Sequence, residues 1–301
     1  MGYLFLGLAL TFGIIKAYCG KKTSSAAALP RDAVMINAVR MSICVFIGIA
    51  IVLFSGASDT LFSGKVVLIS LLSGVANAMF TVSWLLAVHS MAFMLVEVFV
   101  MGGSIIPLLL CSVIYKEKIG VFQIIGVLLL LVAVYCMCTR DSAKRVKIPY
   151  HDLIPLLFAA VSSGICDFSQ KLFIKEVGGG NTATFNFYTY LFATAILLFA
   201  LLFLKLKGAK ADAESPRRNV VAPILHYVVI MAICLFLNVY FKTLAAGHLD
   251  AVLLYPLNQG CAVLLSLLMS MLIFKEKMNV KGFVGIGLSV IAMIIINVVA
   301  K

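Results

Sequence analysis

The stretch VIYKEKIGV (113–121) sets three charged residues between two long apolar runs, and LIFKEKMNV (272–280) repeats this arrangement far along the chain. Lys275 follows Lys116 by 159 residues (275 − 116). Apolar runs align with one another by composition alone, but a charged triplet in the same frame does not, so the chain contains two copies of one unit. Further identities in this ungapped frame pair His89 with His248, Ala92 with Ala251, and Gly126 with Gly285.

The composition is that of a chain dissolved in lipid. Of 301 residues, 63% are hydrophobic and only 12% are charged, whereas a soluble domain carries about 25% charged residues. The net charge of +12 comes from basic residues in short connections, which suits anionic lipid headgroups better than nucleic acid. The eight cysteines lie in or beside apolar runs without ligand spacing, so we expect packing residues and no metal site.

Ten apolar segments have about the 20 residues that a membrane-crossing helix needs. The alternating hydrophobicity of membrane β-barrels is absent, so the sequence predicts a helical bundle. We expect the first segment to be a retained membrane helix, because neither a basic region nor a small-residue cleavage site accompanies it. The expected spans are approximately 2–20, 34–55, 66–88, 92–114, 120–139, 152–174, 184–205, 221–245, 250–273 and 280–299.

The repeat divides these spans into two groups of five. Residues 1–139 form the first unit and 152–301 the second, with a basic connecting loop at 140–151. Because five is an odd number, the second unit enters the membrane from the opposite side. The predicted fold is therefore an all-α membrane protein of ten transmembrane helices in two inverted-topology five-helix repeats, an arrangement typical of secondary transporters.

The end of the second unit, 240–295, carries a more specific pattern. A small-residue turn joins two helices, and the second of these helices has Pro256 near its start. The acidic Glu276 and a final helix with Gly285 follow. This segment resembles the second half-unit of the drug/metabolite transporter superfamily, in its EamA-like branch. The first unit is similar but looser, with Glu97 in place of the proline.

The resemblance implies a ten-helix carrier of metabolites, amino acids or drugs in the bacterial inner membrane, with no cofactor. It also implies that the first, third, fourth, sixth, eighth and ninth spans wall the substrate path and that both termini are cytoplasmic. The charge distribution indicates the opposite orientation, since basic residues are concentrated in the odd-numbered loops and positive charge favours the cytoplasmic side. The orientation therefore stays open.

Charged and polar residues inside the spans are the candidates for a substrate or coupling site, because each is costly in lipid. Glu97 could take up a proton in an exchange cycle, or it could form a structural ion pair with an intramembrane Lys or Arg. We expect Lys16 to reach the interface and Arg40 to have a peripheral structural role. The candidates are Glu97, Asp167, Lys171, Lys242, Asn238, Tyr240, Tyr255, Asn258 and Gln259.

Two of these candidates, Asp167 and Lys171, are four residues apart and share one helix face. They could pair with each other, or they could face a central cavity together with Lys242. Pro107 and Pro256 are expected to interrupt their helices, and broken helices often flank the site of a transporter. Glycines of the last span allow close helix contact and are a candidate homodimer seam.

Together these features predict a secondary active transporter that moves a small polar metabolite, amino acid-like or otherwise zwitterionic or anionic, by alternating access. Protons or a counter-substrate could drive it, since no ATP-binding motif is present. A proton-coupled multidrug or cation exporter is the alternative within transport, and a non-transporting membrane scaffold or receptor is the alternative outside it. The sequence carries no catalytic triad or metal-ligand cluster, so it does not predict an enzyme.

Overall fold

The computed structural model describes residues 1–55, 63–91, 93–117, 120–138, 150–178, 182–208 and 220–275, with a few positions between 284 and 295. Within these residues all regular structure is helical, as the sequence predicts. Seven helices of this part are long and apolar enough to cross a membrane. The helices are α1 (Gly2–Ser24), α2 (Pro30–Ser55), α3 (Gly64–Ser90), α4 (Phe93–Gly102), α5 (Ile105–Tyr115), α6 (Val121–Cys138), α7 (Tyr150–Val177), α8 (Thr182–Gly208), the single turn η2 (Ala222–Ile224), α9 (Leu225–Ala246) and α10 (Ala251–Leu272).

Each of the first nine expected spans falls on a helical segment of this set. The fourth span is divided into α4 and α5, and the fifth corresponds to the shorter α6. The tenth expected span, 280–299, lies almost wholly outside the described residues. A multi-pass helical membrane protein is therefore confirmed, while the count of ten helices stays a prediction.

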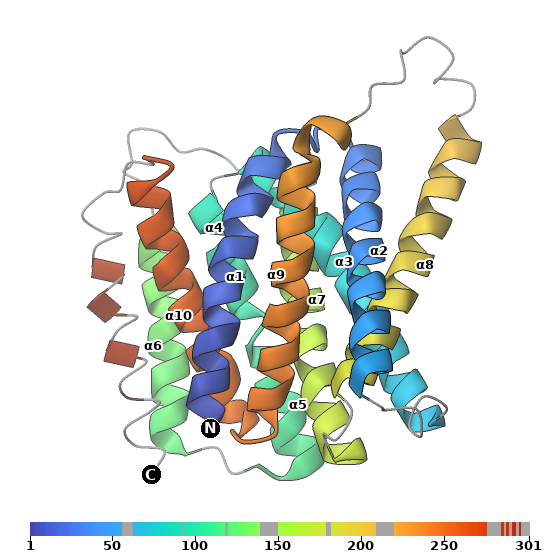
Figure 1. The fold of residues 1–301 in the computed structure, drawn as a ribbon. Helices are drawn as coiled ribbons and strands as arrows, with labels where there is room; N and C mark the ends of the chain where they lie inside the picture. The colour runs from blue at the N-terminus through green and yellow to red at the C-terminus, as the bar shows by residue number, and fades with distance from the viewer. Residues whose placement is uncertain are drawn as a thin grey trace.

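The outer surface of the bundle is apolar. Phe54 at the end of α2 is 92% exposed, and Leu198, Phe199 and Leu202 of α8 are also exposed. α8 lies at the edge of the bundle (Figure 1), where such side chains face outward. A surface of this kind would promote aggregation in water, but lipid solvates it, and the helices satisfy their own backbone hydrogen bonds.

Helices from the two halves of the chain pack side by side. α1 lies against α9 and α3 against α7, while α2 contacts α8 and α4 contacts α10 (Figure 1). Exchanging the two halves of the chain maps the first of these pairs onto the second. The core is thus built between the halves rather than within each of them.

The directions of these helices follow from contacts at their ends. Gly2 at the start of α1 lies against Leu249, just beyond the end of α9. Lys65 at the start of α3 forms an ion pair with Glu176 at the end of α7, with Nζ 3.7 Å from Oε2. α1 is therefore antiparallel to α9, and α3 is antiparallel to α7.

The ends of α1 and α3 also meet each other. His89 Nδ1, near the end of α3, lies 2.7 Å from the carbonyl oxygen of Ser24, the last residue of α1. α1 and α3 therefore run in one direction through the bundle, and α7 and α9 run in the other (Figure 1).

The fourth span is broken at Gly103 and Ser104, between α4 and α5. The backbone N–H groups of these two residues bond three residues back instead of four, and Pro107 has no N–H with which to continue the ladder. A Cβ on Gly103 would lie 2.1 Å from the Ala160 carbonyl oxygen of α7, so this close approach requires glycine. α10, by contrast, continues through Pro256, and the interruption expected there is wrong.

The two KEK triplets begin with the same unusual backbone conformation. Lys116 has a φ of 53° and Lys275 a φ of 52°, in the left-handed region that non-glycine residues seldom adopt. Lys116 ends α5, and Lys275 follows the end of α10. The first triplet lies by the start of α10, because Glu117 Oε2 accepts a hydrogen bond from the Ala251 N–H at 2.9 Å. The two triplets therefore lie at opposite ends of α10. Their other residues, Lys118, Glu276 and Lys277, are outside the described part of the chain.

Candidate functional site

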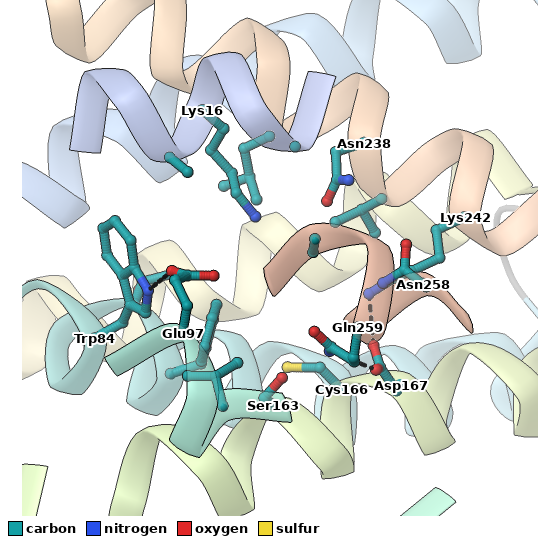
Figure 2. A pocket seen from close by; sticks show the side chains of 18 of the residues that line it. Lys16, Trp84, Glu97, Ser163, Cys166, Asp167, Asn238, Lys242, Asn258 and Gln259 are labelled. Carbon is teal, nitrogen blue, oxygen red and sulfur yellow. Dashed lines mark hydrogen bonds and ion pairs between the residues drawn. The ribbon is translucent and has the colours of Figure 1, made fainter. Parts of the chain in front are cut away.

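A cavity of about 100 Å³ with charged side chains in its lining lies between the helices. It is lined by side chains of α1, α2, α3, α4, α7, α9 and α10 (Figure 2). These helices include all six spans that the family resemblance implied, and α2 is added through Arg40. Both halves of the chain contribute to the cavity. The candidate residues that line it are Glu97, Asp167, Lys242, Asn238, Asn258 and Gln259.

An ion pair between Asp167 of α7 and Lys242 of α9 closes one side of the cavity (Figure 2). The Lys242 Nζ atom lies 2.5 Å from Asp167 Oδ1, and Gln259 Nε2 donates to Oδ2 at 3.3 Å. The Asp167 side chain is 1% exposed, so Lys242 compensates a carboxylate that water reaches poorly.

Glu97 lies on the other side of the cavity, beside Trp84 (Figure 2). Trp84 Nε1 donates to Glu97 Oε1 at 2.8 Å. None of the ion pairs among the described residues involves Glu97, so the structural ion pair considered for this residue is not formed there. The indole positions the carboxylate, and Lys16 interacts with it electrostatically without forming a close ion pair.

Lys16 and Arg40 line the same cavity, and both sequence-based expectations for them are wrong. Lys16 points from α1 into the cavity instead of reaching the interface (Figure 2). Arg40 is 3% exposed and lies in the core rather than at the periphery. Distance from a helix end suggested the first expectation, but that distance does not say which face of the helix a side chain occupies.

Two asparagine side chains of the second half also belong to the polar part of the lining. Asn238 Nδ2 donates to the Ala9 carbonyl oxygen at 2.6 Å, which ties α9 to α1. Asn258 of α10 lines the cavity and is mostly buried. Both residues were candidates from the sequence, and their amides can donate to or accept from a polar solute.

The remaining candidates lie elsewhere. Tyr240 packs on Phe236 at a centroid separation of 6.3 Å. Tyr255 is fully buried, and its hydroxyl donates to the Asp167 backbone carbonyl at 2.5 Å, so it supports the site from behind. Lys171 is outside the cavity lining.

Lys171 belongs to a second group of charges, which we call the Glu117 cluster: Glu117, Lys171 and Lys175. Glu117 Oε1 lies 3.6 Å from Lys171 Nζ and 3.5 Å from Lys175 Nζ. Lys171 Nζ also donates to the carbonyl oxygens of Ala246 (3.0 Å) and Leu249 (2.6 Å), in the turn between α9 and α10. Neither alternative for Asp167 and Lys171 therefore describes both residues, because Asp167 pairs with Lys242 of α9 and Lys171 pairs with Glu117, which follows the end of α5.

Trp84 was missed by the sequence analysis, together with the cavity roles of Lys16 and Arg40. Two signals were available: Trp84 is the only tryptophan of the chain, and an arginine within an apolar helix is rare without a buried role. In the described part of the chain, no group of three His, Cys, Asp or Glu residues could hold a metal ion.

Comparison with known proteins assigns the family. Residues 153–298 match the EamA-like transporter family. This match supports membership of the drug/metabolite transporter superfamily. A solved structure titled "Crystal structure of protein" aligns with 97% of both chains at a TM-score of 0.71 and 16% identity. At 16% identity, the similarity between this chain and the solved structure shows a shared fold. No curated protein sequence matches this chain significantly.

Membership of the drug/metabolite transporter superfamily gives the bundle its general role. The EamA-like family is one of transporters, and the apolar helices described above agree with a multi-pass membrane protein. In such a protein a polar cavity between the helices is the natural candidate for the transported solute.

Proposed function

We propose that this EamA-like chain is a secondary transporter that carries a small polar metabolite, amino acid-like or otherwise zwitterionic or anionic, through its central cavity. One observation carries the proposal: five charged side chains line a single cavity within a largely apolar bundle. Burying charges in a membrane protein costs free energy and marks the path of a substrate or an ion. A non-transporting scaffold has no use for such a set. The five are Lys16, Arg40, Glu97, Asp167 and Lys242.

The transport mechanism we propose is alternating access between two inverted repeats, residues 1–139 and 152–301. The pairing of α1 with α9 and of α3 with α7 supports it, as do their opposite directions. The matching backbone at Lys116 and Lys275 supports it as well. Rocking of one unit against the other would open the cavity to each side of the membrane in turn.

A proton-coupled multidrug or cation exporter is less well supported. Sites for drug-sized molecules usually enclose about 300–1,000 Å³, whereas this cavity has about 100 Å³. A cationic drug would also meet the basic side chains of Lys16, Arg40 and Lys242. The cavity therefore favours a small solute that does not rely on positive charge.

The setting and the driving force belong to the same proposal. We expect the protein in the bacterial inner membrane, driven by protons taken up at Glu97 or by a counter-substrate. A homodimer through the last span, with its glycines at 282, 285 and 287, stays a prediction because that span lies almost wholly outside the described residues.

Flux measurements in proteoliposomes test the proposed function. Full-length protein is reconstituted, and uptake of a broad panel of radiolabelled amino acids and small organic acids is followed with and without a pH gradient. We expect protein-dependent flux of at least one solute. Protein-free liposomes are the control, and complete absence of flux across the panel would contradict the proposal.

A further inference from the structure

We propose that Lys16 and Arg40 form an anion subsite within the cavity, and that this subsite binds the carboxylate of a small substrate. The proposal deepens the proposed function and rests on it, because the cavity is taken to be the substrate site. It concerns two residues that come from α1 and α2, in the first half of the chain.

Lys16 supplies a cation that interacts electrostatically with Glu97 but is not held in a close ion pair. No hydrogen bond or ion pair joins its Nζ atom to any described residue, and Figure 2 shows it pointing into the cavity between Glu97 and Asn238. Lys242, by contrast, is held by Asp167 at 2.5 Å. A lysine ammonium has three donors, so Lys16 can direct its donors to a solute.

Arg40 is buried with almost no acceptor. Its Nη1 atom donates only to the Met231 sulfur, at 3.3 Å, and its Nε atom has no hydrogen-bond partner in the structure. A thioether is a weak acceptor, and a guanidinium has five donors. A buried charge left in this state is costly, and a carboxylate in the cavity would supply the missing acceptors.

The charge balance of the cavity identifies the group that fits. Asp167 and Lys242 cancel each other, which leaves Lys16 and Arg40 against Glu97 among the described lining residues. One positive charge is therefore uncompensated. A carboxylate carries one negative charge, whereas a phosphate monoester carries about 1.5 to 2 at neutral pH, so the balance points to a carboxylate.

The volume sets the size of this carboxylate. A cavity of about 100 Å³ holds several water molecules or a compact metabolite, but not a drug-sized one. The expected ligands are thus small carboxylates, with or without an ammonium group that could approach Glu97.

Ligand-induced thermal shifts of the purified full-length protein in detergent test the subsite. The probes are small amino acids, their deaminated acids from acetate to butyrate, and the matching amides, which keep the size but lose the negative charge. Members of the first two sets should stabilise the wild type, and the amides should not. Lys16→Gln should weaken carboxylate binding about 10- to 100-fold, the loss expected for one hydrogen bond to a charged group.

Lys22→Gln is the matched control. Lys22 lies on the same helix, but its ammonium sits over the Tyr18 ring at 5.9 Å, outside the cavity lining. This variant should bind carboxylates like the wild type. Arg40→Lys tests the second residue without removing its charge, and it should weaken binding less than Arg40→Gln does.

Three results of the binding measurements would overturn the subsite. One is stabilisation by the amides as large as that by the acids, and another is no stabilisation by any acid. The third is unchanged carboxylate affinity in Lys16→Gln. The flux assay separates the two proposals. If the wild type binds carboxylates, Lys16→Gln loses this binding, and no flux is seen for the wild type, then the subsite stands and transport is refuted. Flux that is indifferent to Lys16→Gln leaves transport and removes the subsite.

Discussion

Two groups of charges are buried in this bundle, and they are compensated to different degrees. In the Glu117 cluster both lysines pair with the one carboxylate, Lys171 also has two carbonyl oxygens, and Lys175 is partly exposed to solvent. Among the described residues that line the cavity, only Asp167 and Lys242 form a close ion pair. Charges that hold helices together need complete sets of partners, whereas charges left facing a cavity can bind a solute. The Glu117 cluster is therefore expected to govern stability, and the cavity charges to govern transport.

The largest effect on stability is expected at Glu117. Its carboxylate compensates Lys171, whose side chain is only 4% exposed, and it accepts a hydrogen bond from the N–H of Ala251, the first residue of α10. Glu117→Ala should lower the free energy of unfolding by about 3–5 kcal/mol, because it leaves a buried cation without its anion. Denaturation in detergent measures this loss. A change below about 1 kcal/mol would remove the distinction between the two groups.

The pair of Asp167 and Lys242 is buried and also lines the cavity. Variants of this pair can therefore separate an effect on stability from an effect on transport. Lys242→Met should destabilise the protein by about 3 kcal/mol, because Asp167 is left buried without its cation. Adding Asp167→Asn should restore most of that stability, since a neutral pair needs no compensation. We expect the double variant to remain inactive in the flux assay. Recovery of both stability and flux would show that the pair is structural only.

In contrast to Glu117, Glu97 should affect transport and leave the stability of the protein nearly unchanged. Glu97→Gln keeps an amide oxygen that can accept the Trp84 N–H, so we expect its unfolding free energy to change by less than about 1 kcal/mol. The variant cannot exchange a proton, and its flux should no longer depend on the pH gradient. Flux measured with and without that gradient decides the matter, and an unchanged dependence would refute the coupling role.

The smallest effect is expected at an exposed pair near the Glu117 cluster. Lys65 and Glu176 are 3.7 Å apart, and their side chains are 72% and 42% exposed. Glu176→Gln should change the stability by less than about 1 kcal/mol, as for other exposed ion pairs. It is the matched control for Glu117→Ala, and a comparable loss would mean that burial does not set the difference.

The fold was largely predictable because hydropathy and the repeat are both local properties of the sequence. Nine expected spans fall on helices, and the frame of 159 residues places Lys116 and Lys275 in the same left-handed conformation. The break in the fourth span lies at Gly103 rather than at Pro107 itself, because it depends on the close contact with α7.

The site was predictable only in part, because pairing depends on how helices are rotated against one another. Sequence spacing put Asp167 and Lys171 on one face, but the helix turn between them is enough to place Asp167 in the cavity lining and Lys171 outside it. Asp167 therefore meets Lys242, and Lys171 meets Glu117. Apolar residues surround each helix, so the sequence does not mark which face points inward. The expectation for Lys16 therefore rested on its distance from the helix end alone, and it was wrong.

Alternating access to the cavity is the central claim, and Cys166 offers the most direct test. This cysteine of α7 lines the cavity. In a variant that keeps Cys166 and replaces the other cysteines, a small membrane-impermeant thiol reagent is applied to either side of oriented proteoliposomes. If access alternates, Cys166 is modified from both sides, and a bound carboxylate slows the reaction. Modification from one side only, whatever solute is present, would contradict it.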